Sequence, residues 1–262
     1  MEVVIKPDAE AVAAHVADAF VNVISTRSSP VLGLATGSSP LGVYAELVRR
    51  HRAGTVSFRH AHAFLLDEYI GLPPGHPESY RVFIDSHFAG LVDIDAANVH
   101  VPGVGADGPA IVDACAEYEA DMRTRGGVDL QLLGIGADGH LGFNEPTSSL
   151  SSRTRVKTLT EQTRRDNARF FAGIEDVPRH VVTQGIGTIL DARHLVLIAT
   201  GSAKAEPIAR AVEGPLTSMC PASAIQLHPW ATVVIDEAAA ADLTLADYYR
   251  MTFANKPAWQ TP

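Results

Sequence analysis

Two patterns of apolar residues alternate along the chain. Short runs rich in Val, Ile and Leu are typical of buried strands, and longer segments with an apolar residue every three or four positions are typical of helices. Strands are predicted at residues 31–35, 61–66, 128–135, 194–200 and 232–235, with another near Val99. The alternation predicts an α/β fold with a Rossmann-like, mostly parallel sheet and helices on both faces.

Capping residues place the helices between these strands. Asp8 can cap a helix that runs to about Arg27, because its carboxylate can accept the free N–H groups of the first turn. A second helix is predicted from Pro40 to about His51, where Gly54 follows. Further helices are expected at about residues 80–88, 109–125, 203–213 and 245–253.

A long polar segment follows the strand at residues 128–135. Residues 136–160 are rich in Ser and Thr, and loops of this length in a compact domain are usually functional or mobile. We therefore expect a single domain over residues 1–262 with a lid at about residues 147–175.

The composition narrows the classes of partner. The net charge of −9 gives no general positive field for nucleic acid or an anionic membrane, so neither is expected to bind. No apolar run is long enough to span a membrane and the N-terminus does not resemble a signal peptide, which favours a cytoplasmic protein. The two cysteines are far apart and the histidines lack zinc-binding spacing, so we expect no disulfide and no metal.

Two polar turns are candidates for binding a phosphate, since ligands of open parallel sheets bind beyond the carboxyl ends of the strands. The turn Thr36-Gly37-Ser38-Ser39 opens a helix whose free N–H groups favour an anion, although an ordinary helix cap would have the same sequence. The turn that ends at Lys204 repeats this arrangement and adds an ammonium group. A solvated helix position for that lysine is the alternative.

Carboxylates follow two of the predicted strands. Asp67 comes directly after apolar residues, where partial loss of water would raise its pKa and make it a better proton acceptor. The glycine-rich stretch that follows the strand at residues 128–135 places Asp138 and Glu145 near His140, and two carboxylates can orient an imidazole for acid–base work. A structural aspartate and a core histidine are the alternatives, but glycines at a strand end favour a functional site.

The predicted lid carries a local excess of positive charge in an otherwise acidic chain. This excess indicates anion binding, although a solvated helix face is the alternative. The basic residues are Arg153, Arg155, Lys157, Arg164, Arg165 and Arg169.

Taken together, these motifs closely resemble the glucosamine-6-phosphate deaminase family. The similar segments are residues 34–40, 66–73, 76–80, 134–146, 148–160, 201–205 and 226–229. The resemblance covers nearly the whole chain and weakens only after about Asp242. It implies an enzyme that isomerises and deaminates glucosamine 6-phosphate to fructose 6-phosphate and ammonia, a hydrolase of a carbon–nitrogen bond that needs no cofactor. It also implies a place in the catabolism of N-acetylglucosamine and other amino sugars.

The resemblance assigns roles to the candidate residues. Asp67 would be the base at C2 of the sugar, while His140 would assist ring opening, oriented by Asp138 and Glu145. The substrate phosphate would be held at the first turn, with charge supplied from two basic side chains. The residues implied for that phosphate site are Thr36, Gly37, Ser38, Ser39, Arg169 and Lys204.

The resemblance also implies assembly and regulation. Some members of the family are hexamers activated by N-acetylglucosamine 6-phosphate bound between subunits, so we expect a homo-oligomer, with a hexamer among the candidates. Ser148, Arg155 and Lys157 match the positions of that regulatory site. The C-terminal tail departs from the pattern that supplies a tyrosine to it, although Tyr249 lies close by.

Two other functions are compatible with the motifs. A 6-phosphogluconolactonase-like hydrolase would have a similar fold and similar phosphate turns, but it would not need the Asp-Gly-His and Phe-Asn-Glu-Pro runs of residues 138–146. A non-catalytic sugar-phosphate-sensing domain is the second alternative. Regulators of that kind carry a DNA-binding domain, and no basic helix-turn-helix segment precedes the first predicted strand.

Overall fold

Seven parallel strands form the central sheet of the computed structural model, which describes residues 1–103, 105–257 and 259–260, apart from the side chain of Asp166. Their spatial order is β1 (Glu2–Lys6), β10 (Ala231–Asp236), β9 (Leu195–Ala199), β6 (Leu130–Leu133), β2 (Val31–Leu34), β3 (His62–Leu65) and β5 (Val99–His100). Strands β2, β6, β9 and β10 are buried at every position, as expected for a sheet covered on both faces.

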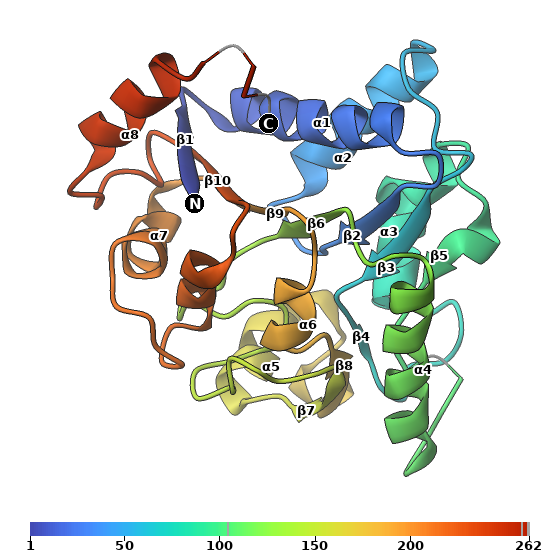
Figure 1. Cartoon of the computed structure of the whole chain (residues 1–262). Coiled ribbons are helices and arrows are strands. Elements are labelled where there is room, and N and C mark those ends of the chain that lie inside the picture. The colour runs from blue at the N-terminus through green and yellow to red at the C-terminus, as the bar shows by residue number, and fades with distance from the viewer. Residues whose placement is uncertain (104, 258, 261–262) are drawn as a thin grey trace.

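Helices cover both faces of this sheet (Figure 1), which confirms the predicted fold class. Helices α1 and α2 lie on one face with α8 beside them, while α4, α6 and α7 lie on the other. The helices are α1 (Ala9–Thr26), α2 (Leu41–Arg52), α3 (Tyr80–His87), α4 (Ala110–Thr124), α5 (Glu161–Asn167), α6 (Ile186–Leu190), α7 (Ala205–Val212) and α8 (Ala246–Ala254). Short 3₁₀ turns η1 (Ala89–Leu91), η2 (Ala96–Asn98), η3 (Ala168–Phe170), η4 (Ile174–Asp176), η5 (Ser202–Lys204) and η6 (Pro221–Leu227) complete the elements.

The helix ends agree with their capping residues. The Asp8 carboxylate accepts the N–H of Ala11 at 2.8 Å, which confirms the predicted start of α1. Helix α2 begins at Leu41 after Pro40, and no side chain caps its first turn. Its last turn is followed by Gly54, which has a positive φ and donates its N–H to the carbonyl of His51.

A second, smaller sheet lies beyond the carboxyl ends of the central strands (Figure 1). It is antiparallel, with the order β4 (Asp67–Tyr69), β8 (His180–Thr183) and β7 (Arg155–Thr158). The sequence indicates a loop rich in Pro and Gly from Asp67 to Ser79, and this prediction is wrong at its start, where β4 lies. Strands β1, β7 and β8 were not predicted. Each of these strands is short and is stabilised by a strand that is distant in sequence, so local periodicity does not reveal it.

The core has one large body and two smaller clusters, one of which is a satellite on the small sheet. The large body packs against both faces of the central sheet and includes the fully buried side chains of Phe20, Tyr44, Phe64 and Leu132. The satellite lies on the small sheet and is built from Tyr69, Phe143, Leu159 and Val181. The small sheet thus has its own apolar contacts at the place where the candidate residues follow the central strands.

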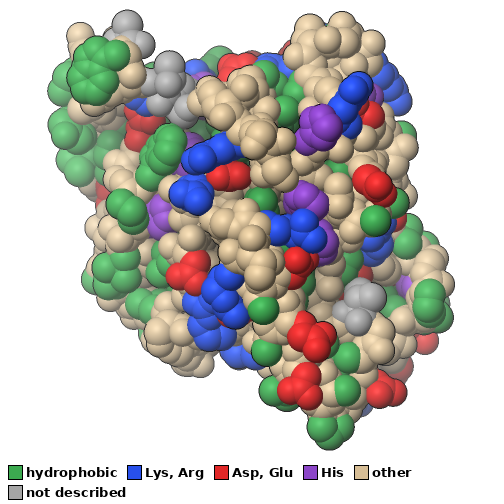
Figure 2. All heavy atoms as spheres, turned by 45° about the vertical axis from the view of Figure 1, so that its right-hand side comes forward, with side chains coloured by type: hydrophobic (Ala, Val, Ile, Leu, Met, Phe, Trp, Pro, Cys, Tyr) green, Lys and Arg blue, Asp and Glu red, His purple; other side chains and the backbone are tan. Residues whose placement is uncertain are grey.

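The surface carries charges of both signs. Basic, acidic and His side chains are interspersed over the face shown in Figure 2. Among the described residues, no helix has the length and apolar character needed to cross a bilayer.

Candidate active site

The carboxyl ends of β2, β3, β6 and β9 bring four loops together, as the sequence predicted. Ser39, in the turn after β2, lies against Gly134 at the end of β6, where a Cβ added at Gly134 would be 3.8 Å from the serine Oγ. Lys204, after β9, donates from its Nζ to the carbonyl of Ile135 at 2.7 Å. The turn of residues 36–39, here called the phosphate turn, and Lys204 therefore border the same glycine-rich loop, residues 134–146.

Asp67 is the first residue of β4 and is only 5% exposed. Its Oδ1 is buried and accepts no hydrogen bond within the described chain. Burial and, after it, the negative charge of neighbouring Glu68 raise the pKa of Asp67 to about 8. Once ionised, this carboxylate is a much stronger base than an ordinary aspartate.

Thr183 and Gly142 join Asp67 to the glycine-rich loop. Thr183 is paired with Asp67 across the small sheet, and its hydroxyl accepts the N–H of Phe143 at 3.1 Å. Gly142 has a φ of +56°, and a Cβ there would lie 2.9 Å from Thr183 Oγ1 and 3.3 Å from Asp67 Oδ2. Only glycine allows this approach, so Asp67 and the loop of His140 meet at one edge of the molecule.

Asp138 orients His140 within that loop. The Nδ1 of His140 lies 2.7 Å from Asp138 Oδ1, and the backbone N–H of His140 donates to the same oxygen at 3.1 Å. The close approach of the His140 side chain lowers the pKa of Asp138 and outweighs the effect of its burial. The imidazole lies over Gly136, where a Cβ would approach the ring to 2.2 Å, so this glycine makes room for the predicted acid–base group.

Glu145 has contacts that the sequence did not predict. Its carboxylate is 7% exposed and accepts hydrogen bonds from the hydroxyls of Thr160 and Thr163, at the start of α5. These two residues lie within the predicted lid, residues 147–175. The structure thus joins Glu145 to the lid, and its part in orienting His140 stays a prediction.

The lid also contacts the strand of Asp67 directly. The Asn167 amide donates to the hydroxyl of Tyr69 at 2.9 Å, and the Phe171 ring meets the Tyr69 ring edge-on at 5.7 Å. Phe171 also stacks on His76 at 6.0 Å. Because Tyr69 is two residues from Asp67 on the same strand, both side chains lie on one face of β4, and the segment that carries Asn167 and Phe171 packs on this face.

The phosphate turn has the features of an anion site. Gly37 has a φ of +91° with open space beside it, and the Ser38 side chain is exposed. The turn leads into α2, whose first turn has no side-chain cap and leaves N–H groups free for a ligand. Burial lowers the pKa of Lys204, and the nearby charge of Asp138 opposes this effect.

The remaining predicted residues lie on the segment that follows the glycine-rich loop. Arg169 is exposed on η3, with its guanidinium 4.6 Å over the Phe170 ring, so its contact with a phosphate stays a prediction. Arg155 and Lys157 lie on the same face of β7, two residues apart. Arg155 donates to the Asn144 side chain at 2.9 Å. The Ser148 hydroxyl is buried and makes no hydrogen bond within the described chain.

Two residues of the site were missed from the sequence. Glu68 lies inside the motif of residues 66–73, but no role was predicted for it. After burial, the charge of its buried carboxylate is the second cause of the raised pKa of Asp67. Thr183 belongs to a strand that the pattern did not reveal. Its pairing with Asp67 depends on β8, and no local signal in the sequence indicates that contact.

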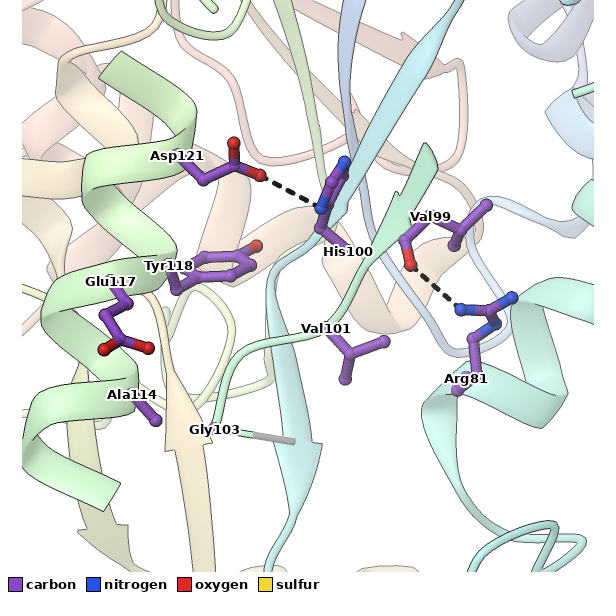
Figure 3. A pocket seen from close by; sticks show the side chains of 9 residues that line it. All are labelled: Arg81, Val99, His100, Val101, Gly103, Ala114, Glu117, Tyr118 and Asp121. Carbon is purple, nitrogen blue, oxygen red and sulfur yellow. Dashed lines mark hydrogen bonds and ion pairs between the residues drawn. The ribbon is translucent and has the colours of Figure 1, made fainter. Parts of the chain in front are cut away.

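A hollow of about 380 Å³ lies elsewhere, between α4 and the edge strand β5 (Figure 3). In it Asp121 points from α4 toward His100, whose Nδ1 is 3.1 Å away, and Arg81 points at the carbonyl of Val99. None of the predicted catalytic or phosphate-binding residues lines this hollow. The described residues also include no cluster of three His, Cys, Asp or Glu placed to hold a metal ion.

The arrangement suits proton transfer on a small anionic substrate. A buried carboxylate with a raised pKa can remove a proton from carbon, and an oriented imidazole can move a proton at an oxygen nearby. An anion held at the phosphate turn would fix the substrate between them.

Comparisons with known proteins agree on one family. A family model described as glucosamine-6-phosphate isomerases/6-phosphogluconolactonase matches residues 7–234. The chain is 59% identical over 261 residues to the glucosamine-6-phosphate deaminase of Arthrobacter sp. (strain FB24), covering 99% of each chain. It is 57% identical over 262 residues to the enzyme of that name from Mycolicibacterium smegmatis, again covering 99% of each.

Solved structures extend the comparison. A monomeric glucosamine-6-phosphate deaminase superposes with a TM-score of 0.88 at 39% identity, covering 92% of this chain and 100% of that one. The 6-phosphogluconolactonase of Trypanosoma brucei superposes with a TM-score of 0.73 at 19% identity, covering 93% and 98% of the two chains. The second likeness shows a shared fold alone.

Proposed function

The chain belongs to the family of glucosamine-6-phosphate isomerases and 6-phosphogluconolactonases, and from that premise we propose how its residues act. It is a glucosamine-6-phosphate deaminase, an enzyme of carbohydrate metabolism that converts glucosamine 6-phosphate to fructose 6-phosphate and ammonia. The observation that carries this conclusion is the 59% identity to a protein of that name over 99% of both chains. The lactonase alternative is not favoured, because the lactonase quoted above shares only 19% identity.

Asp67 is the base that moves the proton of the substrate. In the open-chain amino aldehyde, Asp67 takes the proton from C2, and the electron pair of that bond forms the C1=C2 double bond of the enolamine. The electron pair of the C1=O bond moves to the aldehyde oxygen, which takes a proton and becomes a hydroxyl. The same proton returns to C1, which leaves an imine at C2. Water adds to this imine and ammonia leaves, so the ketone is formed without any redox change. The raised pKa of Asp67 supports this role, because a general base works best when its pKa lies near the operating pH.

His140 and Asp138 open the sugar ring. Ring opening needs a proton on the ring oxygen and the loss of a proton from the C1 hydroxyl, and an imidazole can supply both transfers near neutral pH. Asp138, 2.7 Å from Nδ1, holds the ring so that Nε2 remains for the substrate. Glu145 is the second carboxylate proposed to orient His140.

The phosphate of the substrate is held by the phosphate turn and charged side chains. The hydroxyls and N–H groups of Ser38 and Ser39, with Thr36 and Gly37, surround the anion at the start of α2. Lys204 and Arg169 supply positive charge. Anchoring the distant end of the sugar sets C2 against Asp67, which converts an encounter into an intramolecular step.

Residues 147–175 form a lid over this site. Four contacts support this role: the two hydroxyls of Thr160 and Thr163 bond Glu145, and the amide of Asn167 and the ring of Phe171 both contact Tyr69. With the lid in place, Asp67 Oδ1 is buried, so the lid must open before the substrate can enter.

Assembly, regulation and location are further parts of the proposal. We propose a cytoplasmic homo-oligomer, with the hexamer among its forms, in which Ser148, Arg155 and Lys157 bind N-acetylglucosamine 6-phosphate as an activator in the catabolism of that sugar. One side of α8 and its N-cap expose three apolar side chains, Leu245, Tyr248 and Met251, which supports contact with another copy. Both cysteines, Cys115 and Cys220, are buried free thiols, which supports a reducing compartment. Light scattering tests the mass, and a substrate curve that stays unchanged with the acetylated sugar phosphate would oppose the regulation.

The decisive experiment follows both products. Purified protein is incubated with glucosamine 6-phosphate, and ammonia and fructose 6-phosphate should appear in equal amounts. Asp67→Asn should keep substrate binding but lose turnover and the exchange of the C2 hydrogen with solvent. If the wild-type protein releases neither product, a sugar-phosphate-sensing role replaces the enzymatic one, and exchange that persists in Asp67→Asn would assign the base elsewhere.

A further inference from the structure

A second buried carboxylate stands directly beside the base. Glu68 follows Asp67 on β4 and is only 8% exposed. Successive side chains of a strand point to opposite faces, so Glu68 lies on the face of the small sheet that is turned away from the substrate side. Its register partner on β8 is the buried, apolar Val182. Glu68 therefore does not line the reaction space, and the proposed mechanism gives it no step.

Four donors hold the Glu68 carboxylate in place. Oε1 accepts the backbone N–H groups of Tyr69 and Tyr80, both at 2.9 Å. Oε2 accepts the Ser79 hydroxyl at 2.8 Å and the N–H of Arg81 at 3.0 Å. Both oxygens act as acceptors only, as those of an ionised carboxylate do. The N–H groups of residues 80 and 81 open α3, so the helix end and β4 are fixed to each other through this one side chain.

No positive side chain neutralises Glu68 within the described residues. Arg81 is the nearest candidate, but its guanidinium is turned away from the strand. It donates to Asp85 at 2.8 Å and to the carbonyls of Val99 and Ala96 at 2.9 and 3.1 Å, and Figure 3 shows it pointing at Val99. All the donors to Glu68 are neutral backbone or hydroxyl groups, so none of them brings a positive charge to its carboxylate.

The other titratable groups around Asp67 do not offset the effect of Glu68 on it. Burial raises the pKa of Tyr69 to about 12 and raises those of Tyr80 and Tyr118 further, so the three phenols are neutral near pH 7. Arg155 is in register with Asp67 across Thr183, and its guanidinium is directed to the Asn144 side chain. His140, two residues before Gly142 on the glycine-rich loop, is held by Asp138.

We propose that Glu68 is a positioning residue for the deamination, which locks β4 to the start of α3 and keeps a fixed negative charge behind Asp67 that strengthens it as a base. Its position on the opposite face lets it act on Asp67 without contacting the sugar. Two like charges on adjacent buried residues favour the protonated form of the less well solvated one, and that one is Asp67, whose Oδ1 has no donor. This inference rests on the proposed function and deepens it.

The test is the pH profile of kcat/KM for glucosamine 6-phosphate in Glu68→Gln. The variant is nearly isosteric, and its amide oxygen can still accept the N–H groups of Tyr69 and Tyr80. Removing the charge should move the acidic limb of the profile to lower pH by about one unit, because the free-enzyme base then ionises more readily. A weaker base should also lower the plateau of kcat several-fold.

Glu119→Gln is the matched control. Glu119 is a buried carboxylate on α4 that accepts the N–H of Thr154 at 2.7 Å and the hydroxyl of Thr188, so its loss perturbs packing away from β4. It should lower the melting temperature and leave the acidic limb at the wild-type pH. If the acidic limb of Glu68→Gln also stays there, Glu68 is a structural cap alone and the proposal is overturned.

A second variant keeps the test decisive if Glu68→Gln does not fold. Ser79→Lys, at the half-buried position whose hydroxyl contacts Oε2, brings a positive charge against the Glu68 carboxylate without changing it. The acidic limb should again move to lower pH, and an unmoved limb would overturn the proposal. Absence of ammonia release in the wild type would instead contradict the proposed function, so the two failures are distinguishable.

Discussion

Replacing Asp67 by Asn should make the protein more stable while making it inactive. Burial and Glu68 raise the pKa of Asp67 from 3.8 to about 8 in the folded protein. In the unfolded chain this group ionises near its ordinary pKa, so between pH 4 and 8 the folded state holds a proton that the unfolded state has lost. The contribution of Asp67 to the free energy of unfolding is therefore fully present below about pH 4, and it is lost as the pH rises to about 8.

The size of this effect follows from the two pKa values. At 1.36 kcal/mol per pH unit, the shift from 3.8 to about 8 corresponds to roughly 5 to 6 kcal/mol of destabilisation at pH 8.5. The asparagine amide needs hydrogen-bond partners near the place where Oδ1 has none, which costs about 1–3 kcal/mol. We therefore expect Asp67→Asn to be more stable than the wild type by about 2–5 kcal/mol at pH 8.5.

Urea unfolding of both proteins at several pH values between 4 and 9 measures this difference. The free energy of unfolding of Asp67→Asn should exceed that of the wild type by an amount that grows up to about pH 8. At pH 4 the difference should be small or of the opposite sign. Glu119→Gln gives the opposite sign: burial alone would raise the pKa of Glu119, but hydrogen bonds from Thr188, Thr154 and Arg153 lower it to about 2, so this charge stabilises the fold at neutral pH. A gap between wild type and Asp67→Asn that does not change with pH would refute the assigned ionisation.

Three further outcomes are expected. Asp138→Asn should lower kcat by about 100-fold with little change in melting temperature, because His140 loses its orienting carboxylate; steady-state kinetics measure this, and unchanged turnover would remove the pair from ring opening. Lys204→Met should raise KM for the sugar phosphate by about 10- to 100-fold with kcat within a few-fold of the wild type, and the reverse pattern would exclude it as a phosphate ligand. Phe171→Ala should speed amide hydrogen exchange in residues 160–171 by about tenfold, whereas Phe170→Ala, at a position 52% exposed, should not. Equal exchange rates in the two variants would contradict the packing of Phe171 against Tyr69 and His76.

The central sheet and the main candidate residues could be predicted because their signals are local. Strands such as β6 and β9 are unbroken apolar runs, since every position is buried, and the polar residues that end them fall at the edge where parallel sheets bind ligands. Asp67 and the glycine-rich loop that carries His140 follow two strands of this sheet, so the contact of that loop with Asp67 at Gly142 could be inferred from the shared direction of the strands.

The small sheet could not be predicted for the opposite reason. Strand β7 alternates half-buried and exposed positions, and β4 is three residues long, so neither has an apolar run of its own. Their conformation depends on β8, which is distant in sequence from both. The hydrogen bonds of Thr160 and Thr163 to Glu145 depend in turn on where this sheet places the lid, and residue types alone do not indicate them.

The late position of β8 in the chain has a consequence for synthesis. The residues of β2, β3 and β6 have all left the ribosome before Thr183 is made, so the nascent chain can form much of its central sheet while β4 still lacks the strand beside it. Asp67 is then in water, and its acidity is that of an ordinary aspartate. A product truncated before residue 180 would keep this state permanently: a partly folded chain in which Asp67 never gains its raised pKa, with a bare strand edge open to aggregation.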